Sequence, residues 1–306
     1  MNSSYDHYRI FYYVAKHKNF THAARAWMNS QPNITRSIKN LERELGCALF
    51  TRSNRQVQLT PEGETLYRHV AIAFEHLSAG EEEIAKGKGL DGGVLRIAAT
   101  EVALRAFLLP VLKEFRSNYP GIHVKLINDS TPAAISDVQS GLADLAVVTT
   151  PADTSGTLRE IPLCPIREIA VCGSAYSQLS EAPVSLAELT KYPIISLGET
   201  TTTYGFYARF FSDYDLVLAP DIEAATADQI LPMIKADLGV GFVPEVFLKD
   251  EEIGKTLFPI SLTEPIPLRK VCLLAPMERP LGPAARELEK ALVAASRSAT
   301  LGQPNR

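Results

Sequence analysis

A chain of 306 residues is long enough for two or three domains, and its composition, 46% hydrophobic and 22% charged, excludes a disordered or fibrous protein. The net charge of −4 at pH 7 is unevenly distributed. Residues 1–70 carry ten Lys and Arg against five Asp and Glu, whereas the remainder carries 21 against 30. A basic N-terminal part joined to an acidic body is typical of a DNA-binding domain attached to a second domain.

The sequence has no run of about 18 or more apolar residues, and the polar and aromatic stretch 1–10 is unlike a secretion signal. We therefore expect a cytoplasmic protein. The cysteines Cys47, Cys164, Cys172 and Cys272 lack the C-x-x-C spacing of zinc and redox sites. Buried free thiols are expected rather than a disulfide framework or a zinc site, and no cofactor is predicted.

Three short helices are predicted between residues 6 and 49, where apolar residues recur at helical spacing. Asn19 or Thr21 can cap the second helix, and Ser30 can cap the third, which has Pro32 in its first turn. The apolar positions are Tyr8, Phe11, Val14, Ala23, Ala24, Trp27, Ile34, Ile38, Leu41 and Leu45.

A hairpin with its turn at Ser53-Asn54 is predicted for residues 50–60, and Thr60-Pro61-Glu62 has the composition of another helix start. The apolar residues of that helix alternate at steps of four and three, which is the spacing of a coiled-coil seam. The helix either pairs two chains or packs its apolar face on its own domain. The seam consists of Leu66, Val70, Ala73, Leu77, Gly80 and Ile84.

Residues 85–93, rich in glycine, have the composition of a hinge, and beyond them the pattern changes to alternating strands and helices. This alternation predicts an α/β domain. Strands are expected at 94–98, 124–129, 145–149, 169–172, 194–197, 240–243 and 271–275, and helices at 103–117, 134–140, 204–211, 227–236 and 283–295. The predicted organisation is a DNA-binding domain at 1–60, a linker helix and hinge at 61–91 and a third domain at 92–306.

The second and third helices have the properties of a helix-turn-helix. Ala23 and Ala24 are small enough to let two helices cross closely, and Asn29 in the turn tolerates a left-handed conformation. The early exposed positions of the third helix carry side chains suited to base edges or phosphates: Gln31, Asn33, Thr35 and Arg36. From this pattern alone, a helical hairpin with a polar surface remains the alternative.

The spacing of several motifs makes the first 65 residues resemble the N-terminal signature of LysR-type transcriptional regulators. The motifs are Phe11-x-x-Val14-Ala15, Asn19-Phe20-Thr21-x-Ala23-Ala24, Ser30-Gln31-Pro32, Leu41-Glu42-x-x-Leu45-Gly46-x-x-Leu49-Phe50-x-Arg52 and Leu59-Thr60-Pro61-Glu62-Gly63. The rest resembles the effector domain of that family more loosely, through Leu109-Pro110, Tyr119-Pro120-Gly121, Gly141-x-x-Asp144-Leu145-Ala146 and Gly239-x-Gly241-Phe242-x-Pro244. Trp27 and Thr35 depart from the usual leucine and serine.

The resemblance implies how the N-terminal domain contacts double-stranded DNA. Gln31, Pro32, Thr35 and Arg36 would lie against the major groove, and Arg36 is the strongest candidate for base readout because a guanidinium can bond guanine bidentately. At the wing, Arg55 would reach the minor groove or its phosphates, and Arg52 the DNA backbone. For Arg52, Arg55 and Lys39 the alternative is solvated surface charge or a phosphate contact without sequence information.

The resemblance also implies two α/β lobes like those of type 2 periplasmic binding proteins, with a small-molecule effector bound between them. The chain would cross between lobes near Leu163–Ile166 and Pro265–Leu268, so that one lobe contains residues 92–163 and 268–306 and the other 164–267. A homo-oligomer, a dimer of dimers, is implied as well.

Threonines stand where predicted strands end and helices begin, and four of them are candidate effector ligands: Thr100, Thr149, Thr202 and Thr203. Hydroxyls beside helix N–H groups would bind a small anion or a carboxylate without any buried lysine or arginine. Alternatively, these threonines only cap helices. Glu101 and Glu199 would repel an anion if they faced the cleft.

Enzymatic function has little support in the sequence. His123 is the one histidine of the predicted α/β part, and no G-x-S-x-G, Walker or H-E-x-x-H motif occurs. We therefore expect a ligand-responsive transcription regulator rather than an enzyme. The alternatives are a solute receptor that binds ligand in its cleft, and an α/β hydrolase with an accessory helical domain.

Overall fold

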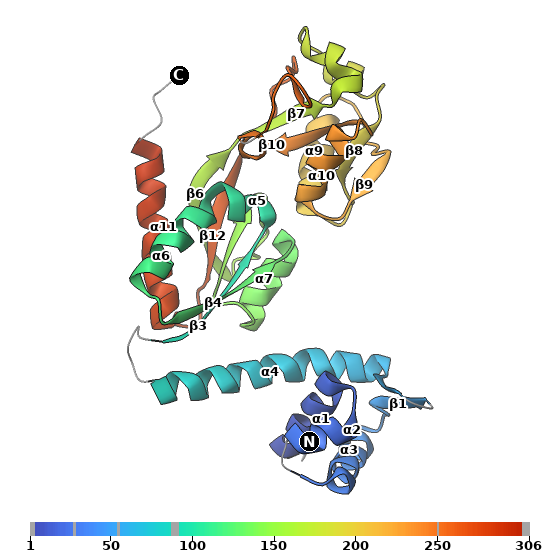
Figure 1. Cartoon of the computed structure of the whole chain (residues 1–306), viewed down its shortest axis with the longest axis vertical. Helices are drawn as coiled ribbons and strands as arrows, with labels where there is room; N and C mark the ends of the chain where they lie inside the picture. Colours follow the sequence, from blue (N-terminus) through green and yellow to red (C-terminus); the bar gives the residue numbers. More distant parts are fainter. Residues whose placement is uncertain (1–3, 27–28, 54–55, 87–91, 250, 302–306) are drawn as a thin grey trace. The chain divides into compact units, whose positions relative to one another are not determined.

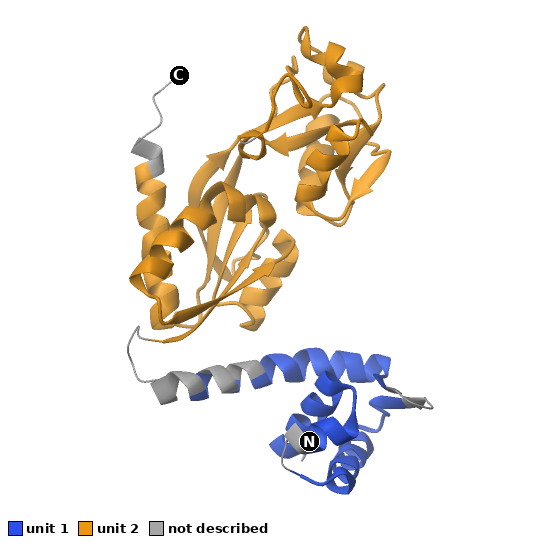
Figure 2. Ribbon diagram, in the orientation of Figure 1, with its two compact units in different colours: residues 1–87 blue, residues 88–306 orange. Residues whose placement is uncertain are grey.

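The structure is a computed structural model that describes residues 4–26, 29–53, 56–86, 92–249 and 251–301. The chain divides into unit 1, with residues 1–87, and unit 2, with residues 88–306 (Figure 2). Among the described residues, each unit has a hydrophobic core of its own. The predicted fold class, an N-terminal helix-turn-helix domain followed by two α/β lobes, is confirmed.

Unit 1 packs helices and a two-stranded hairpin around buried aromatic and aliphatic side chains. Phe11, Val14 and Ala23 have no exposed surface at the centre of this core. Gly46, in the left-handed region at φ 73°, ends the third helix. The elements are α1 (Tyr5–His17), α2 (Phe20–Ala26), α3 (Gln31–Leu45), β1 (Phe50–Ser53), β2 (Gln56–Leu59) and α4 (Pro61–Lys86).

Side-chain acceptors shape the turn of the helix-turn-helix. Asn19 caps α2, because its Oδ1 accepts from the backbone N–H groups of Thr21, at 2.8 Å, and His22, at 3.1 Å. Within the turn, Asn29 Oδ1 accepts from the backbone N–H of Ser30 at 2.8 Å. The side chain of Ser30 makes no capping bond. Two predicted features, Trp27 and the Asn54 half of the hairpin turn, lie outside the described residues.

The long helix α4 begins as the sequence predicts, with Thr60 Oγ1 accepting from the backbone N–H of Gly63 at 2.9 Å. Its N-terminal half packs on unit 1 itself: Val70 belongs to the core, and the ring of Phe74 stacks on Tyr12 with 4.5 Å between centroids. Val70 therefore packs on its own domain, and pairing of two chains through the rest of the stripe stays a prediction. Leu77, by contrast, is exposed.

Unit 2 contains two five-stranded sheets (Figure 1), with strand orders β4-β3-β5-β12-β6 and β11-β7-β10-β8-β9. In the first lobe lie β3 (Gly93–Ala99), α5 (Glu101–Ala103), the π-helix η1 (Leu104–Leu108), α6 (Leu109–Asn118), β4 (Ile122–Asn128), α7 (Thr131–Ser140), β5 (Leu145–Thr149), β6 (Leu158–Ile166), β12 (Arg269–Pro276) and α11 (Pro283–Leu301). In the second lie β7 (Glu168–Cys172), η2 (Ser174–Ser180), α8 (Leu186–Leu189), β8 (Ile194–Leu197), α9 (Thr202–Ser212), β9 (Ile222–Ala224), α10 (Ala227–Lys235), β10 (Val240–Pro244), η3 (Glu245–Leu248) and β11 (Phe258–Ile260).

Helices cover both faces of the first sheet, which is why its central strands are apolar at consecutive positions. Ile97 and Leu273 face α6 and α11, whereas Ala98 and Leu274 face α7. The predicted helix 103–117 contains a π-helical turn, η1. Pro110, in the first turn of α6, has no N–H to donate to the preceding turn, which accounts for this local widening.

The chain crosses between the lobes at Arg167, where β6 ends and β7 begins, and again between β11 and β12. The segment Leu163–Ile166 is strand rather than connection, so the first lobe extends three residues beyond the predicted boundary. β6 pairs with β12 alone, at an edge of the sheet where its two prolines do not interrupt a second ladder.

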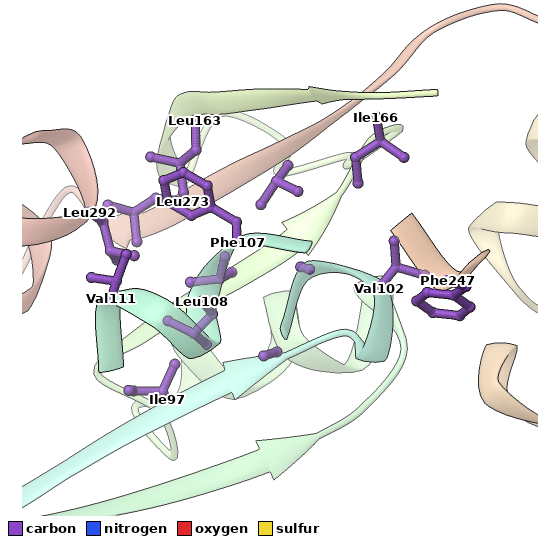
Figure 3. Close-up of a cluster of buried hydrophobic side chains, with 14 of the residues drawn as sticks. Ile97, Val102, Phe107, Leu108, Val111, Leu163, Ile166, Phe247, Leu273 and Leu292 are labelled. Carbon is purple, nitrogen blue, oxygen red and sulfur yellow. The ribbon is translucent and has the colours of Figure 1, made fainter. Parts of the chain in front are cut away.

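The largest core cluster continues from one lobe into the other (Figure 3). Val102 of α5 and Phe247 of η3 belong to this same cluster. The guanidinium carbon of Arg105 lies 4.2 Å from the centroid of the Phe247 ring. The two lobes are therefore joined by apolar contact as well as by the two crossing connections.

Candidate DNA-binding surface and effector site

The exposed face of α3 is the candidate DNA-binding surface. Ile34, Ile38 and Leu41 point into the core with 1% or less of their surface exposed, which turns the opposite side of the helix to solvent. A shallow, open depression on that side is lined by Gln31, Pro32, Thr35, Arg36, Lys39, Asn40 and Arg43. The sequence analysis named five of these residues and missed Asn40 and Arg43, which extend the same face by one turn.

The N-terminal end of α3 is held by neighbouring side chains. Thr21 Oγ1 donates to Gln31 Oε1 at 3.3 Å, and the Asn33 amide donates to Asn29 Oδ1 at 3.0 Å. Arg36 and Lys39 are exposed, and neither makes a hydrogen bond or ion pair with any described residue. Their charges are therefore free to meet phosphates or bases.

The hairpin that follows α3 pairs β1 with β2 in antiparallel register, Arg52 opposite Val57. The backbone of Arg52 is thus placed, while Arg55 lies outside the described residues. The wing contacts expected for both arginines stay predictions.

Two of the candidate effector residues lie at the carboxyl ends of the parallel strands β3 and β5 of the first sheet. Thr100 caps α5, its Oγ1 accepting from the backbone N–H of Ala103 at 3.3 Å, and its own backbone N–H donates to Val147 at 3.2 Å. Thr149 is the last residue of β5 and exposes 2% of its surface. Thr100 therefore does cap a helix, and its hydroxyl oxygen already accepts one hydrogen bond.

A buried arginine lies at the junction of the lobes, contrary to the expectation of an anion site without one. Arg269, at the start of β12, donates from Nη1 to Glu168 Oε1 at 3.0 Å and from Nε to the carbonyl of Thr150 at 2.7 Å. Its Nη2 donates to Thr149 Oγ1 at 2.8 Å and to Thr203 Oγ1 at 3.1 Å. The first of these threonines belongs to one lobe and the second to the other, so a single guanidinium joins both.

Glu168 holds the other end of this network. Its Oε2 accepts from the Tyr207 hydroxyl at 2.8 Å, and the Arg269–Glu168 pair exposes 1% and 0% of the two side chains. Burial, and then the nearby Glu168 carboxylate, raise the pKa of Tyr207 well above its ordinary value. The phenol therefore remains a proton donor to Glu168 throughout the physiological range.

The remaining candidates lie around the start of α9. Thr201, which the sequence analysis did not select, is its N-cap and accepts from the backbone N–H of Tyr204 at 3.1 Å. Thr202 follows as the first helical residue and is half-buried. In β8, the hydroxyl of Ser196 is buried with no hydrogen-bond partner among the described residues.

Glu101 and Glu199 would repel an anion only if they faced the cleft. The carboxylate of Glu101 accepts from the Asn128 amide at 3.2 Å, at the end of β4, and Glu199 is exposed. Within the described parts of the chain, no group of His, Cys, Asp and Glu side chains could hold a metal ion. None of the helices described there is long and apolar enough to cross a membrane.

Sequence reasoning missed the Arg269–Glu168 pair because its members lie 101 residues apart. A signal was nevertheless present. Glu168 directly precedes the apolar strand segment Ile169–Cys172, and Arg269 stands two residues before the apolar segment Val271–Ala275. Charged residues at the buried ends of strands require a partner, and two of opposite sign at the predicted crossings could have been paired.

Family models match most of the chain. The model for the LysR substrate binding domain matches residues 88–297, and the model for the bacterial regulatory helix-turn-helix protein of the lysR family matches residues 5–64. The transcriptional regulator CysB of Burkholderia cenocepacia is 30% identical over 255 residues, which is 81% of this chain and 80% of that protein. The activator IlvY of Haemophilus influenzae is 26% identical and covers 94% of this chain and 96% of its own length.

Solved structures show the same fold at lower identity. The LysR family regulator CbnR superimposes with a TM-score of 0.72 at 16% identity, covering 96% of this chain and 99% of CbnR. CbnR in complex with its target DNA gives a TM-score of 0.71 at 17% identity, over 97% and 99% of the two chains. Full-length OxyR from Pseudomonas aeruginosa gives 0.63 at 20% identity, over 97% and 95%.

Proposed function

The chain belongs to the LysR family of transcriptional regulators, and on this premise we propose that α3 reads a specific DNA site under the control of a small-molecule effector. The protein acts as a homo-oligomer on double-stranded DNA. Its effector binds between the lobes of unit 2, at Thr100, Thr149, Thr202 and Thr203. The domains are a DNA-binding domain at 1–60, a linker helix and hinge at 61–91, and an effector domain from 92 onward.

The observation that carries this proposal is the exposed polar and basic face of α3. Its apolar residues are buried in the unit, and Arg36 and Lys39 have no partner in the described structure. A cleft-binding solute receptor would not need this helix-turn-helix. A hydrolase is not favoured either, since His123 is exposed on the edge strand β4. We infer a non-enzymatic protein that acts in the cytoplasm, where its DNA is.

The experiment begins with the DNA that the protein protects in its own genome. On that site, Arg36→Ala should weaken binding by about 1–3 kcal/mol and relax the preference at one base position, because a guanidinium contacts a base edge there. Lys39→Ala should weaken binding to all DNA sequences equally and reduce the salt dependence of binding, because Lys39 contacts phosphate.

Lys113→Ala is the matched control, since it removes an equal charge from an exposed position of unit 2 and should change neither property. Equal losses of affinity for cognate and random DNA in Arg36→Ala would contradict base readout by Arg36.

A further inference from the structure

The guanidinium of Arg269 restricts what the two threonine hydroxyls beside it can do. Both oxygens accept a hydrogen bond from the same Nη2 atom, at 2.8 Å for Thr149 and 3.1 Å for Thr203. A hydroxyl that accepts from a cation cannot turn its own proton toward that cation. Each proton is therefore available for another acceptor, and among the described residues neither hydroxyl donates a hydrogen bond.

Arg269 itself is not free to meet a ligand. Its Nε donates to the Thr150 carbonyl and its Nη1 to Glu168, and its side chain is 1% exposed. The guanidinium carbon also lies 5.2 Å from the centroid of the Phe206 ring. The charge of Arg269 is thus fixed in place, and any influence on a ligand passes through the hydroxyls that it holds.

We propose that Arg269 is a positioning residue that makes the Thr149 and Thr203 hydroxyls hydrogen-bond donors toward the effector, so that the site accepts a carboxylate or another oxyanion and rejects an ammonium group. This inference rests on the effector site proposed above and states the chemistry of its ligand. A hydroxyl polarised by a bound cation donates more strongly to an anionic oxygen. An ammonium group, which only donates, would have to compete with Arg269 for the same oxygens.

The test uses the full chain and titrates three probes at matched ionic strength: sodium acetate, sodium sulfate and methylammonium chloride. Thermal unfolding reports binding, because a ligand that binds only the folded state raises the unfolding temperature saturably. For the wild type we expect saturable stabilisation by acetate or sulfate and none by methylammonium.

The decisive variant is the double change Arg269→Met with Glu168→Leu, because replacing both members of a buried ion pair by apolar residues leaves no unpaired charge. It should raise the dissociation constant of the oxyanion at least about tenfold and reduce the discrimination against methylammonium. Should the double variant fail to fold, Arg269→Lys carries the test. Lysine has three protons for the four acceptors around Arg269, so it should give a smaller loss in the same direction.

Arg159→Met is the matched control: this arginine forms an ion pair with Glu289 on the outside of the same lobe, and its loss should leave the oxyanion constant unchanged. The proposal is overturned by an unchanged constant in the Arg269 variants, by methylammonium binding to the wild type, or by no oxyanion response. The decisive readout is the discrimination between the oxyanion and methylammonium. A variant whose structure is only loosened would bind all the probes more weakly by the same factor. Cognate DNA binding, measured on the same preparation, judges the regulator function separately.

Discussion

The thiols of Cys172 and Cys272 are both buried in unit 2, within strands β7 and β12. Burial raises the pKa of Cys172 to about 11, with Asp237 adding to the effect. Burial also raises the pKa of Cys272 to about 12, helped by the Sγ–H bond to Glu160 Oε1 at 3.2 Å. Since the thiolate is the reactive form, neither cysteine should act as a redox or metal-binding group near neutral pH.

Alkylation tests whether these two buried thiols are unreactive in the folded protein. With iodoacetamide at pH 8, peptide mapping of the native protein should show Cys172 and Cys272 unmodified, whereas urea should expose all four cysteines. The free energy of unfolding should fall as the pH rises from about 9 toward 11, because the unfolded chain loses the thiol proton first. Cys172→Ala should make this fall shallower. Rapid native labelling of either thiol at pH 8 would contradict the assignment.

Some functional residues could be identified from the sequence, whereas the contacts between others could not. Arg36 was identified because the recognition helix is continuous, so that spacing decides which side chains face outward, whereas Lys39 was named only through the family resemblance. The network around Arg269 depends instead on how two distant crossings come together. Thr149 and Thr203 were selected as independent hydroxyls, and only the three-dimensional structure shows one guanidinium between them.

At the scale of elements, the long apolar strands and amphipathic helices were predicted with few differences, since each carries its own periodicity. The strand β6 was missed because Pro162 and Pro165 argue against a central strand, and only its edge position makes them acceptable. The short strands β9 and β11 have three residues each, too few for a periodic signal.

The helix α4 gives a prediction at this scale. Val70 is 8% exposed and Leu77 48%, so the two halves of the proposed seam differ in what they can contact. Leu77→Glu should leave unit 1 folded and reduce the mass of the oligomer, because it places a charge where a second chain would pack. Val70→Glu should unfold unit 1, because it buries a charge in the unit's own core.

Light scattering and circular dichroism distinguish these outcomes. Arg68→Glu is the control, since Arg68 lies nine residues before Leu77 and therefore on the opposite side of the helix. If Leu77→Glu retains the native mass and DNA affinity, α4 does not join the subunits through this position.

For the whole molecule, the charge asymmetry and the change of pattern near residue 90 already indicated two parts. The structure gives each part its own core, and among the described residues no side chain belongs to both. Since cooperative unfolding follows shared packing, the two units should unfold in separate transitions.

Calorimetry of the full chain should therefore resolve two transitions. Ile34→Val, which removes one methyl group from the core of unit 1, costs about 0.5–1.5 kcal/mol and should lower one transition alone. Ile97→Val, the matched change in unit 2, should lower the other. An oxyanion probe at about a hundred times its dissociation constant should stabilise unit 2 by about 2.7 kcal/mol and leave the Ile34-sensitive transition in place. A single transition that both substitutions and the probe move together would show that the two units unfold as one cooperative body.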